Sequence, residues 1–185
     1  MYSIDELRRN ILERLIHLDI ELAEKYKNNK KVFKLIIVGS SAIALKHNLL
    51  RITDDIDSLH IEEELWEFLR KNYEVYRIND RCKGIILLHP DYEERLVKIK
   101  IDYKFNFLDI YLLSDYDLII TKFGRGYPQD LKDIKESGIL KNIDIHKLHK
   151  LANESFEYHV GEEKLKKNWA LFTNEILEER WFLYV

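Results

Sequence analysis

The chain has 185 residues, of which 34% are charged and 46% are hydrophobic, and its formal net charge is −3 at pH 7. This length is sufficient for one substantial hydrophobic core. The slightly acidic balance excludes an overall basic surface for nucleic acid, although it does not exclude local basic patches. No apolar run approaches membrane-spanning length, and no signal-peptide pattern opens the sequence, so we expect no membrane association and a cytoplasmic location. The single cysteine, Cys82, excludes an internal disulfide and fits a reducing compartment.

The first predicted element is a long amphipathic helix that ends at about Lys25. Ser3 and Glu6 have the spacing of a capping box at its start. Apolar residues then recur at helical intervals at Leu7, Ile11, Leu15, Leu18 and Leu22. A polar, lysine-rich linker follows, which we interpret as a solvated loop rather than a nucleic-acid contact.

The stretch 34–61 is the part of the sequence that carries most of the chemistry. Residues 35–38 are a continuous apolar run, which predicts a buried strand. Gly39, Ser40 and Ser41 then allow a sharp turn into a short helix. When the chain returns as a strand, period-two alternation places Asp55 and Asp57 on one face.

Two carboxylates on one strand face repel each other unless a positive group lies between them. A divalent cation or a basic side chain satisfies this requirement. We favour the cation, Mg²⁺ or Mn²⁺, because such ions bind one or two carboxylates together with substrate phosphates. Backbone N–H groups at the start of the helix after Gly39 would then receive the phosphates of a nucleoside triphosphate. The alternative is a solvated strand end with no ligand, which an isolated Asp-x-Asp pair indicates more often.

The middle of the sequence predicts a helix over residues 62–72 and then four strands, at 73–78, 84–88, 95–103 and 107–113. The turn between the first two lies around residues 81–84. Asp102, in the third of these strands, is the predicted third metal carboxylate, and Asp109 in the fourth competes for that role. For either residue the alternative is an acid at a strand end that pairs with a nearby lysine, and for Asp109 we favour that interpretation.

A helix from Asp115 to Phe123 is predicted next, and Gly124 to Gly126 would end it. Lys122 lies at its end, where its ammonium could assist a triphosphate or only counter the helix dipole. Pro128 begins the following helix, and Asp130 and Asp133 share one face of it. These two acids could orient Lys122 or a neighbouring arginine, position an acceptor, or simply favour the helix start.

Beyond Gly138 the pattern predicts helices over 144–158 and 162–180. Three histidines lie in this region, but without a cysteine or a metal-binding spacing we interpret them as exposed side chains: His146, His149 and His159. Five aromatic residues near the end would pack against the core or form a subunit interface: Trp169, Phe172, Trp181, Phe182 and Tyr184. The second option implies a homo-oligomer.

Two motifs resemble the nucleotidyltransferase superfamily, namely IIVGS at 36–40 followed by DDIDSL at 54–59. The Arg-x-Thr that precedes the aspartates, the segment PDYEERLVKI and the cluster LSDYDLIITKFGRGYPQDLKDI are similar to minimal, AbiEii-like proteins of that superfamily. The resemblance spans roughly residues 34 to 135. It implies functional roles for Lys122, Arg125, Asp130 and Asp133.

The expected fold is therefore a single α/β domain with a nucleotidyltransferase-like mixed sheet, with its core at about 32–137 and a helical region at about 138–185. The resemblance implies metal-dependent transfer of a nucleoside monophosphate from a triphosphate to a hydroxyl of RNA, such as tRNA, or of a protein. It also implies a toxin–antitoxin or phage-defence role with a cognate antitoxin. The alternative is a binding or regulatory protein that keeps this fold without the chemistry.

Overall fold

The computed structural model describes residues 4–28, 31–49, 53–80 and 86–182, with the side chains of residues 4 and 176–182 excepted. Within them the chain forms a mixed five-stranded sheet in the order β3-β2-β1-β5-β4. The strands are β1 (Phe33–Ile37), β2 (Ile56–Leu59), β3 (Ile78–Asn79), β4 (Val97–Lys98) and β5 (Leu108–Leu112). Central β1 runs parallel to β5 and antiparallel to β2. The expected mixed α/β fold is confirmed.

Strand β1 is the buried centre of the sheet. Leu35, Ile36 and Ile37 are all at most 3% exposed, because neighbouring elements cover both faces of the strand. The predicted strand is confirmed, and it begins two residues earlier, at Phe33. On β5, by contrast, buried and half-buried residues alternate, as on a strand with one face toward the core.

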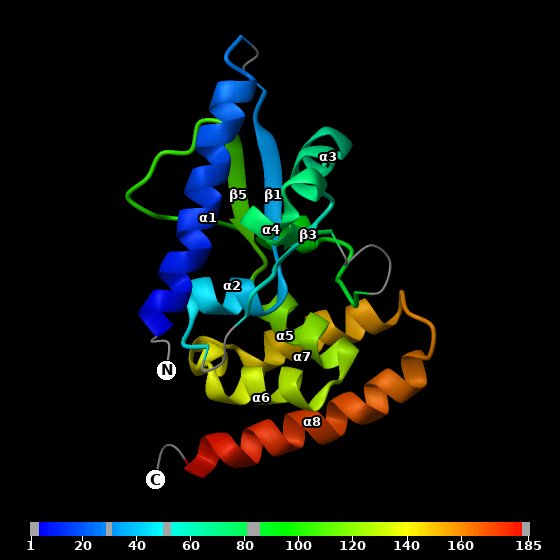
Figure 1. Cartoon of the computed structure of the whole chain (residues 1–185). Coiled ribbons are helices and arrows are strands. Elements are labelled where there is room, and N and C mark those ends of the chain that lie inside the picture. The colour runs from blue at the N-terminus through cyan, green and yellow to red at the C-terminus, as the bar shows by residue number, and fades with distance from the viewer. Residues whose placement is uncertain (1–3, 29–30, 50–52, 81–85, 183–185) are drawn as a thin grey trace.

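Helix α1 (Ile4–Lys25) runs beside β1 and β5 (Figure 1). Its five apolar residues at helical spacing are buried, as predicted. The buried Asp19 carboxylate fastens the helix to the start of β5, because it accepts backbone N–H bonds from Asn106, Phe107 and Leu108 at 2.8 to 3.2 Å. The expected capping residue Ser3 lies outside the described residues.

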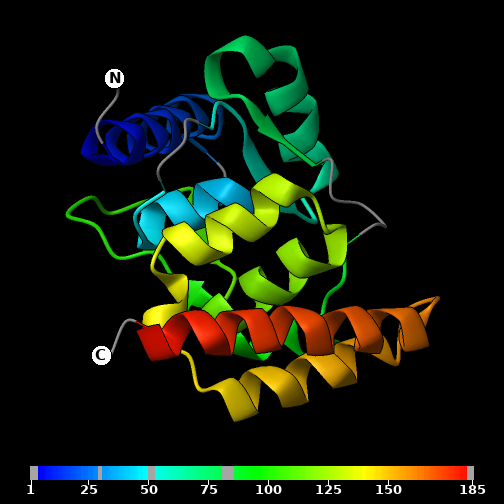
Figure 2. The same ribbon diagram turned by 90° about the horizontal axis from the view of Figure 1, so that it is seen from below.

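Most of the remaining helices gather at the end of the sheet where β1 and β5 finish (Figures 1 and 2). These are α2 (Gly39–Lys46), α5 (Asp115–Arg125), α6 (Pro128–Glu136), α7 (Ile145–Phe156) and α8 (Glu162–Phe182). Helix α3 (Glu63–Lys71), α4 (Tyr73–Tyr76) and two short 3₁₀ turns, Tyr92–Arg95 and Ile139–Asn142, complete the described chain. No described helix is long and apolar enough to cross a membrane.

An aromatic cluster joins α8 to the rest of the fold. Trp169 packs edge-on against Phe123 with ring centroids 4.8 Å apart, and it also contacts Phe156 and Phe172. The predicted packing of Trp169 and Phe172 against the core is therefore confirmed. The side chains of Trp181, Phe182 and Tyr184 lie outside the described part of the chain.

Two of the predicted strands are wrong in large part. Residues Tyr73–Tyr76 are helical, and only Ile78–Asn79 pair as a strand, because Arg77 takes a left-handed conformation with φ of 48° that turns the chain. Of the strand predicted over 95–103, only Val97–Lys98 pair with β5. The chain then leaves the sheet toward α1, where the Tyr103 hydroxyl bonds to the Asp19 carboxylate.

A third predicted strand, 84–88, is not a strand in its described residues 86–88. The turn expected around residues 81–84, including Cys82, lies outside the described residues. Residue Leu87 nevertheless has a fixed place, since a Cβ added at Gly124 would lie 2.5 Å from the Cβ of Leu87. Segment 86–88 therefore packs directly against α5.

Candidate active site

The site begins where β1 ends and α2 begins. Gly39 starts the helix in a left-handed conformation, with φ of +64°, which favours glycine. A Cβ added there would lie 3.3 Å from Oδ2 of Asp57. The neighbouring β2 is held in place by the Val38 N–H, which donates to the carbonyl oxygen of Asp57 at 2.9 Å. The structure therefore brings the Asp57 carboxylate against the first turn of α2.

Asp55 lies just before β2 and is held by groups from several elements. The Tyr73 hydroxyl of α4 donates to Oδ1 of Asp55 at 2.8 Å, and the Ser41 hydroxyl donates to its backbone carbonyl at 2.6 Å. The Arg14 guanidinium donates to the carbonyl of Asp54 at 2.7 Å. Sequence reasoning missed Tyr73, because its segment has the composition of a strand.

The charge of Arg14 is part of the same surroundings. Burial lowers the pKa of the Arg14 guanidinium, and the nearby Arg77 lowers it further, while Asp54 and Asp55 oppose this shift. The two carboxylates therefore help to keep a cation in a partly buried place. This contact links α1 to the loop that carries Asp55.

A buried ionic network lies behind the first turn of α2. Lys122 is 1% exposed, and its Nζ lies 2.8 Å from Oδ1 of Asp130 and 2.7 Å from Oδ2 of Asp133. The same Nζ donates to the Ser40 hydroxyl at 3.3 Å. Asp130 also accepts a 2.6 Å bond from the Arg125 guanidinium. The predicted placement of Asp130 and Asp133 on one face of α6 is confirmed.

This network changes what Lys122 can do. Two carboxylates balance its charge and its side chain is only 1% exposed, so in this arrangement it contacts the first turn of α2 through Ser40. The hydroxyls of Ser40 and Ser41 both donate to protein groups, Asp133 Oδ2 and the carbonyl of Asp55. Phosphate binding at this turn would therefore rely on backbone N–H groups, since the first N–H groups of a helix have no partner within it.

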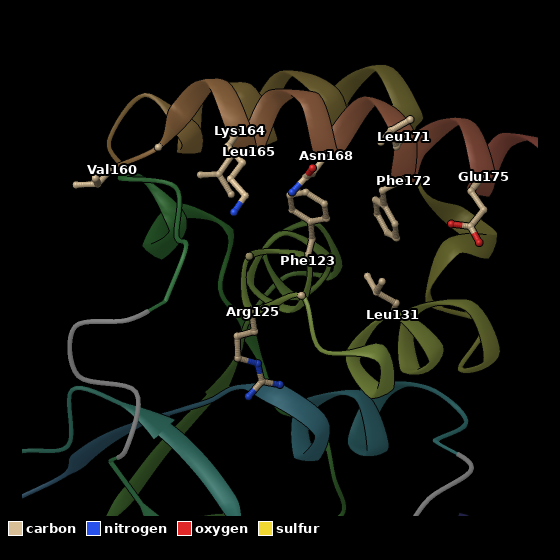
Figure 3. A pocket seen from close by; sticks show the side chains of 13 residues that line it. Phe123, Arg125, Leu131, Val160, Lys164, Leu165, Asn168, Leu171, Phe172 and Glu175 are labelled. Atoms are coloured by element: carbon tan, nitrogen blue, oxygen red, sulfur yellow. The ribbon is translucent and has the colours of Figure 1, made fainter.

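Arg125 reaches from the end of α5 toward α2 (Figure 3). A small cavity of about 30 Å³ lies between this side chain, Gly39, Asp57 and Thr121. The Arg125 side chain is 34% exposed, so it is the cation of this cluster that solvent reaches. Arg125 therefore adjoins both the buried network and the Asp57 carboxylate.

The structure does not bring Asp102 or Asp109 to this site. Asp102 is exposed in a bend outside the sheet. Asp109 is paired in register with Lys34, near the far end of β1 from Gly39, and forms a 2.5 Å ion pair with Lys98. Burial raises the pKa of Asp109, but hydrogen bonds from Lys98 and Tyr111 lower it more, so that its net pKa shift is downward.

Within the described part of the chain, no three His, Cys, Asp or Glu side chains form a group that could hold a metal ion. This finding covers the three histidines of the C-terminal region as well as the aspartates near β2. His146 is exposed as expected, whereas the expectation of exposure is wrong for His149 and His159, which are half-buried. Any cation at Asp55 and Asp57 would therefore take its remaining ligands from phosphate oxygens and water. Mg²⁺ is commonly coordinated in this way in proteins.

The fold and the site define a class of protein. A helix that begins at a glycine after the central strand, with carboxylates at the neighbouring antiparallel strand, is the arrangement that the sequence resemblance implies for nucleotidyltransferases. The family model described as "nucleotidyltransferase of unknown function (DUF6036)" matches residues 13–180. Because the match covers most of the chain, the protein belongs to this family. No curated protein and no solved structure matches the chain.

Proposed function

We propose that the protein is a magnesium-dependent nucleotidyltransferase that moves a nucleoside monophosphate from a nucleoside triphosphate to an acceptor hydroxyl, with release of pyrophosphate. The family's name implies this class of activity. The observation that supports it most directly is the approach of the Asp57 carboxylate to the glycine that begins α2. An anion-binding turn and a metal-binding carboxylate would then lie side by side.

The residues present fit a divalent cation. Asp55 and Asp57 supply oxygen ligands, and the absence of a Cβ at Gly39 leaves room for a phosphate oxygen beside Asp57. Bound there, Mg²⁺ or Mn²⁺ would neutralise the charge that develops on the phosphate during transfer. Asp102, the third metal carboxylate that the sequence predicts, is exposed in a bend outside the sheet and forms no three-ligand group with these two aspartates.

The other proposed roles follow from position. The N–H groups of Gly39, Ser40 and Ser41 would hold the outer phosphates. Arg125, half-exposed beside Asp57, would meet the charge of the triphosphate directly. Lys122 and Asp130 would be positioning residues, since the buried network fixes Ser40 and restrains Arg125.

The acceptor and the biological role belong to this proposal only through the resemblance to AbiEii-like proteins. An RNA hydroxyl, with tRNA as one candidate, or a protein hydroxyl would be the acceptor, and a cognate antitoxin would be the partner.

A second candidate function has one observation in its favour. No third acid joins Asp55 and Asp57 among the described residues, and the buried Lys122 is already neutralised. A protein that binds nucleotide without transferring it would have the same features. The two functions share the binding step and differ only in the chemistry.

The test has two stages, binding and transfer. Binding of each of the four nucleoside triphosphates is measured by calorimetry with Mg²⁺ and with a chelator, for the wild type, Asp57→Asn and Asp54→Asn. Asp54 is the matched control, because its side chain is 73% exposed and it lies beside the candidate pair. We expect Mg²⁺-dependent binding that Asp57→Asn weakens by at least about tenfold, through loss of a charged ligand, while Asp54→Asn retains it.

The transfer stage uses each triphosphate labelled at its α-phosphate, with total RNA and with a protein extract. Label in the acceptor fraction with the wild type and not with Asp57→Asn would establish the transferase and its acceptor class. Binding without label would favour the second candidate. A folded wild type that binds no triphosphate would contradict both.

A further inference from the structure

A second, larger hollow lies next to the candidate site. It is a groove of about 540 Å³ between α8 and the turn that joins α5 to α6 (Figure 3). This size is within the range of roughly 300 to 1,000 Å³ that small-molecule sites have. Its walls are mainly apolar, with Phe123 and Leu131 on one side and Leu165, Leu171 and Phe172 on α8.

The groove meets the candidate site at one residue. Arg125 lines both the groove and the small cavity that contains Gly39 and Asp57. Figure 3 shows its side chain extending from the groove toward α2. A ligand whose phosphates lie at Gly39 and Asp57 would pass Arg125 before its remaining part entered the groove.

The polar groups of the groove restrict what that part can be. Arg125 and Lys164 are cations, and Glu175, the one acid among the described lining residues, forms a 2.5 Å ion pair with Lys135. The groove therefore disfavours a cationic ligand. Asn168 extends from α8 into the middle of the groove, toward Phe123 (Figure 3). Its amide offers both donors and an acceptor among apolar side chains.

We propose that this groove holds the nucleoside of the triphosphate, and that Asn168 selects the base. This inference rests on the proposed function, because it requires the phosphates to lie at the start of α2. A flat, largely apolar base with polar edges matches apolar walls that carry one amide, and the attached negative charge matches Arg125 at the inner end. The binding site would then extend from the first turn of α2, at the end of the sheet, to the C-terminal helix α8.

The experiment separates the phosphates from the nucleoside. Calorimetry with Mg²⁺ compares inorganic triphosphate, which can occupy only the turn, with the four nucleoside triphosphates. The variant Asn168→Trp fills the groove from an exposed helix position. Its matched control is Asn174→Trp, because Asn174 is an exposed asparagine of the same helix outside the groove lining. Circular dichroism confirms that both variants are folded.

We expect the preferred nucleoside triphosphate to bind with at least roughly tenfold higher affinity than inorganic triphosphate, since the base buries apolar surface. In Asn168→Trp that advantage should disappear while inorganic triphosphate binds as before, and Asn174→Trp should behave as the wild type. Asn168→Asp, which exchanges amide donors for a carboxylate, should change the order of preference among the four bases.

Each contrary result has its own meaning. Nucleoside triphosphates that bind no more tightly than inorganic triphosphate, or an unchanged affinity and base order in both Asn168 variants, would overturn the groove inference and leave the proposed function standing. Failure of the wild type to bind any of these ligands would overturn the proposed function, and the inference with it.

Discussion

Replacement of Lys122 by methionine tests whether the buried ionic network holds the site together. Methionine keeps the length of the side chain and removes its charge. The change deprives Asp130 and Asp133 of bonds of 2.8 and 2.7 Å, while both carboxylates stay at most 4% exposed. Removal of one partner from a buried ion pair costs about 3 to 5 kcal/mol, because it leaves an uncompensated charge.

The cost should fall unequally on the two acids. Asp130 keeps its 2.6 Å bond from the Arg125 guanidinium, a charged donor, whereas the donors to Asp133 from Gln129 at 3.0 Å and from the Ser40 hydroxyl at 3.3 Å are neutral. Adding Asp133→Asn to Lys122→Met should therefore restore part of the lost stability, with a coupling free energy of roughly 2 kcal/mol.

Urea unfolding followed by circular dichroism measures these free energies. In thermal unfolding, the same loss of stability in Lys122→Met should lower the Tm of a chain of this size by roughly 6 to 20 °C. Lys166→Met is the control, since Lys166 pairs with Glu162 on the surface of α8 and its loss should hardly change the urea midpoint. A loss below about 1 kcal/mol in Lys122→Met, or strictly additive effects with Asp133→Asn, would refute the reasoning.

Three further predictions concern other parts of the fold. Gly39→Ala should cost about 1 to 2 kcal/mol in urea unfolding and weaken Mg²⁺-dependent triphosphate binding, because a Cβ strains the left-handed backbone and lies 3.3 Å from Asp57. Asp19→Asn should cost about 3 kcal/mol, because an amide cannot accept every N–H bond that the carboxylate accepts. Burial lowers the pKa of His149, and the charge of His146 lowers it further. The neutral ring also accepts the Trp169 indole N–H at its Nδ1. Folding therefore favours the neutral form, and the unfolding free energy should fall as pH drops below 6.5.

Each of these has a matched control. Gly138→Ala introduces the same backbone strain, at φ of +81°, and a Cβ there would meet the Lys141 side chain only at ordinary contact distance, 3.4 Å, so it should lower stability without weakening nucleotide binding. Asp102→Asn removes an exposed aspartate and should leave the urea midpoint unchanged. His149→Gln should flatten the pH dependence between pH 5 and 7, because the neutral form is the one that folding favours, while His146→Gln should retain most of it. An unchanged slope in His149→Gln would assign the pH effect to another group.

The helices and the central strand could be predicted because their signals are local. The apolar spacing from Leu7 to Leu22 requires only the helical period, and the apolar run of β1 requires only burial on both faces. The helix start at Pro128 likewise follows from a single residue. Helix α5 continues two residues beyond its predicted end at Phe123, and the left-handed Gly126 ends it.

The predictions are wrong where a contact with a residue far away in the sequence determines the local structure. Tyr73 to Tyr76 have strand-forming side chains, yet they form a helical turn in which the fully buried Tyr76 packs near α1 and Phe68. Residues 99–103 alternate like a strand, but the buried Asp19 draws their end away from the sheet. Neither contact has any signature in the local sequence.

The candidate site divides in the same way. The order of strand, glycine, helix and Asp-x-Asp was sufficient to predict that Gly39 and Asp57 belong to one place, and the structure brings them together. The burial of Lys122 could not be predicted, because it depends on how α6 returns across α5. The contact from Tyr73 to Asp55 was hidden by the wrong strand prediction.

The bond between Ser40 and Asp133 also bears on how the chain folds. It joins residues 93 positions apart, and a contact of that separation forms only after a long loop has closed. During synthesis the first turn of α2 emerges long before α6 does. In the same way, strand β1 can pair with its parallel neighbour β5 only after β5 has been synthesised. The first turn of α2 should therefore be among the last parts of the nascent protein to become rigid.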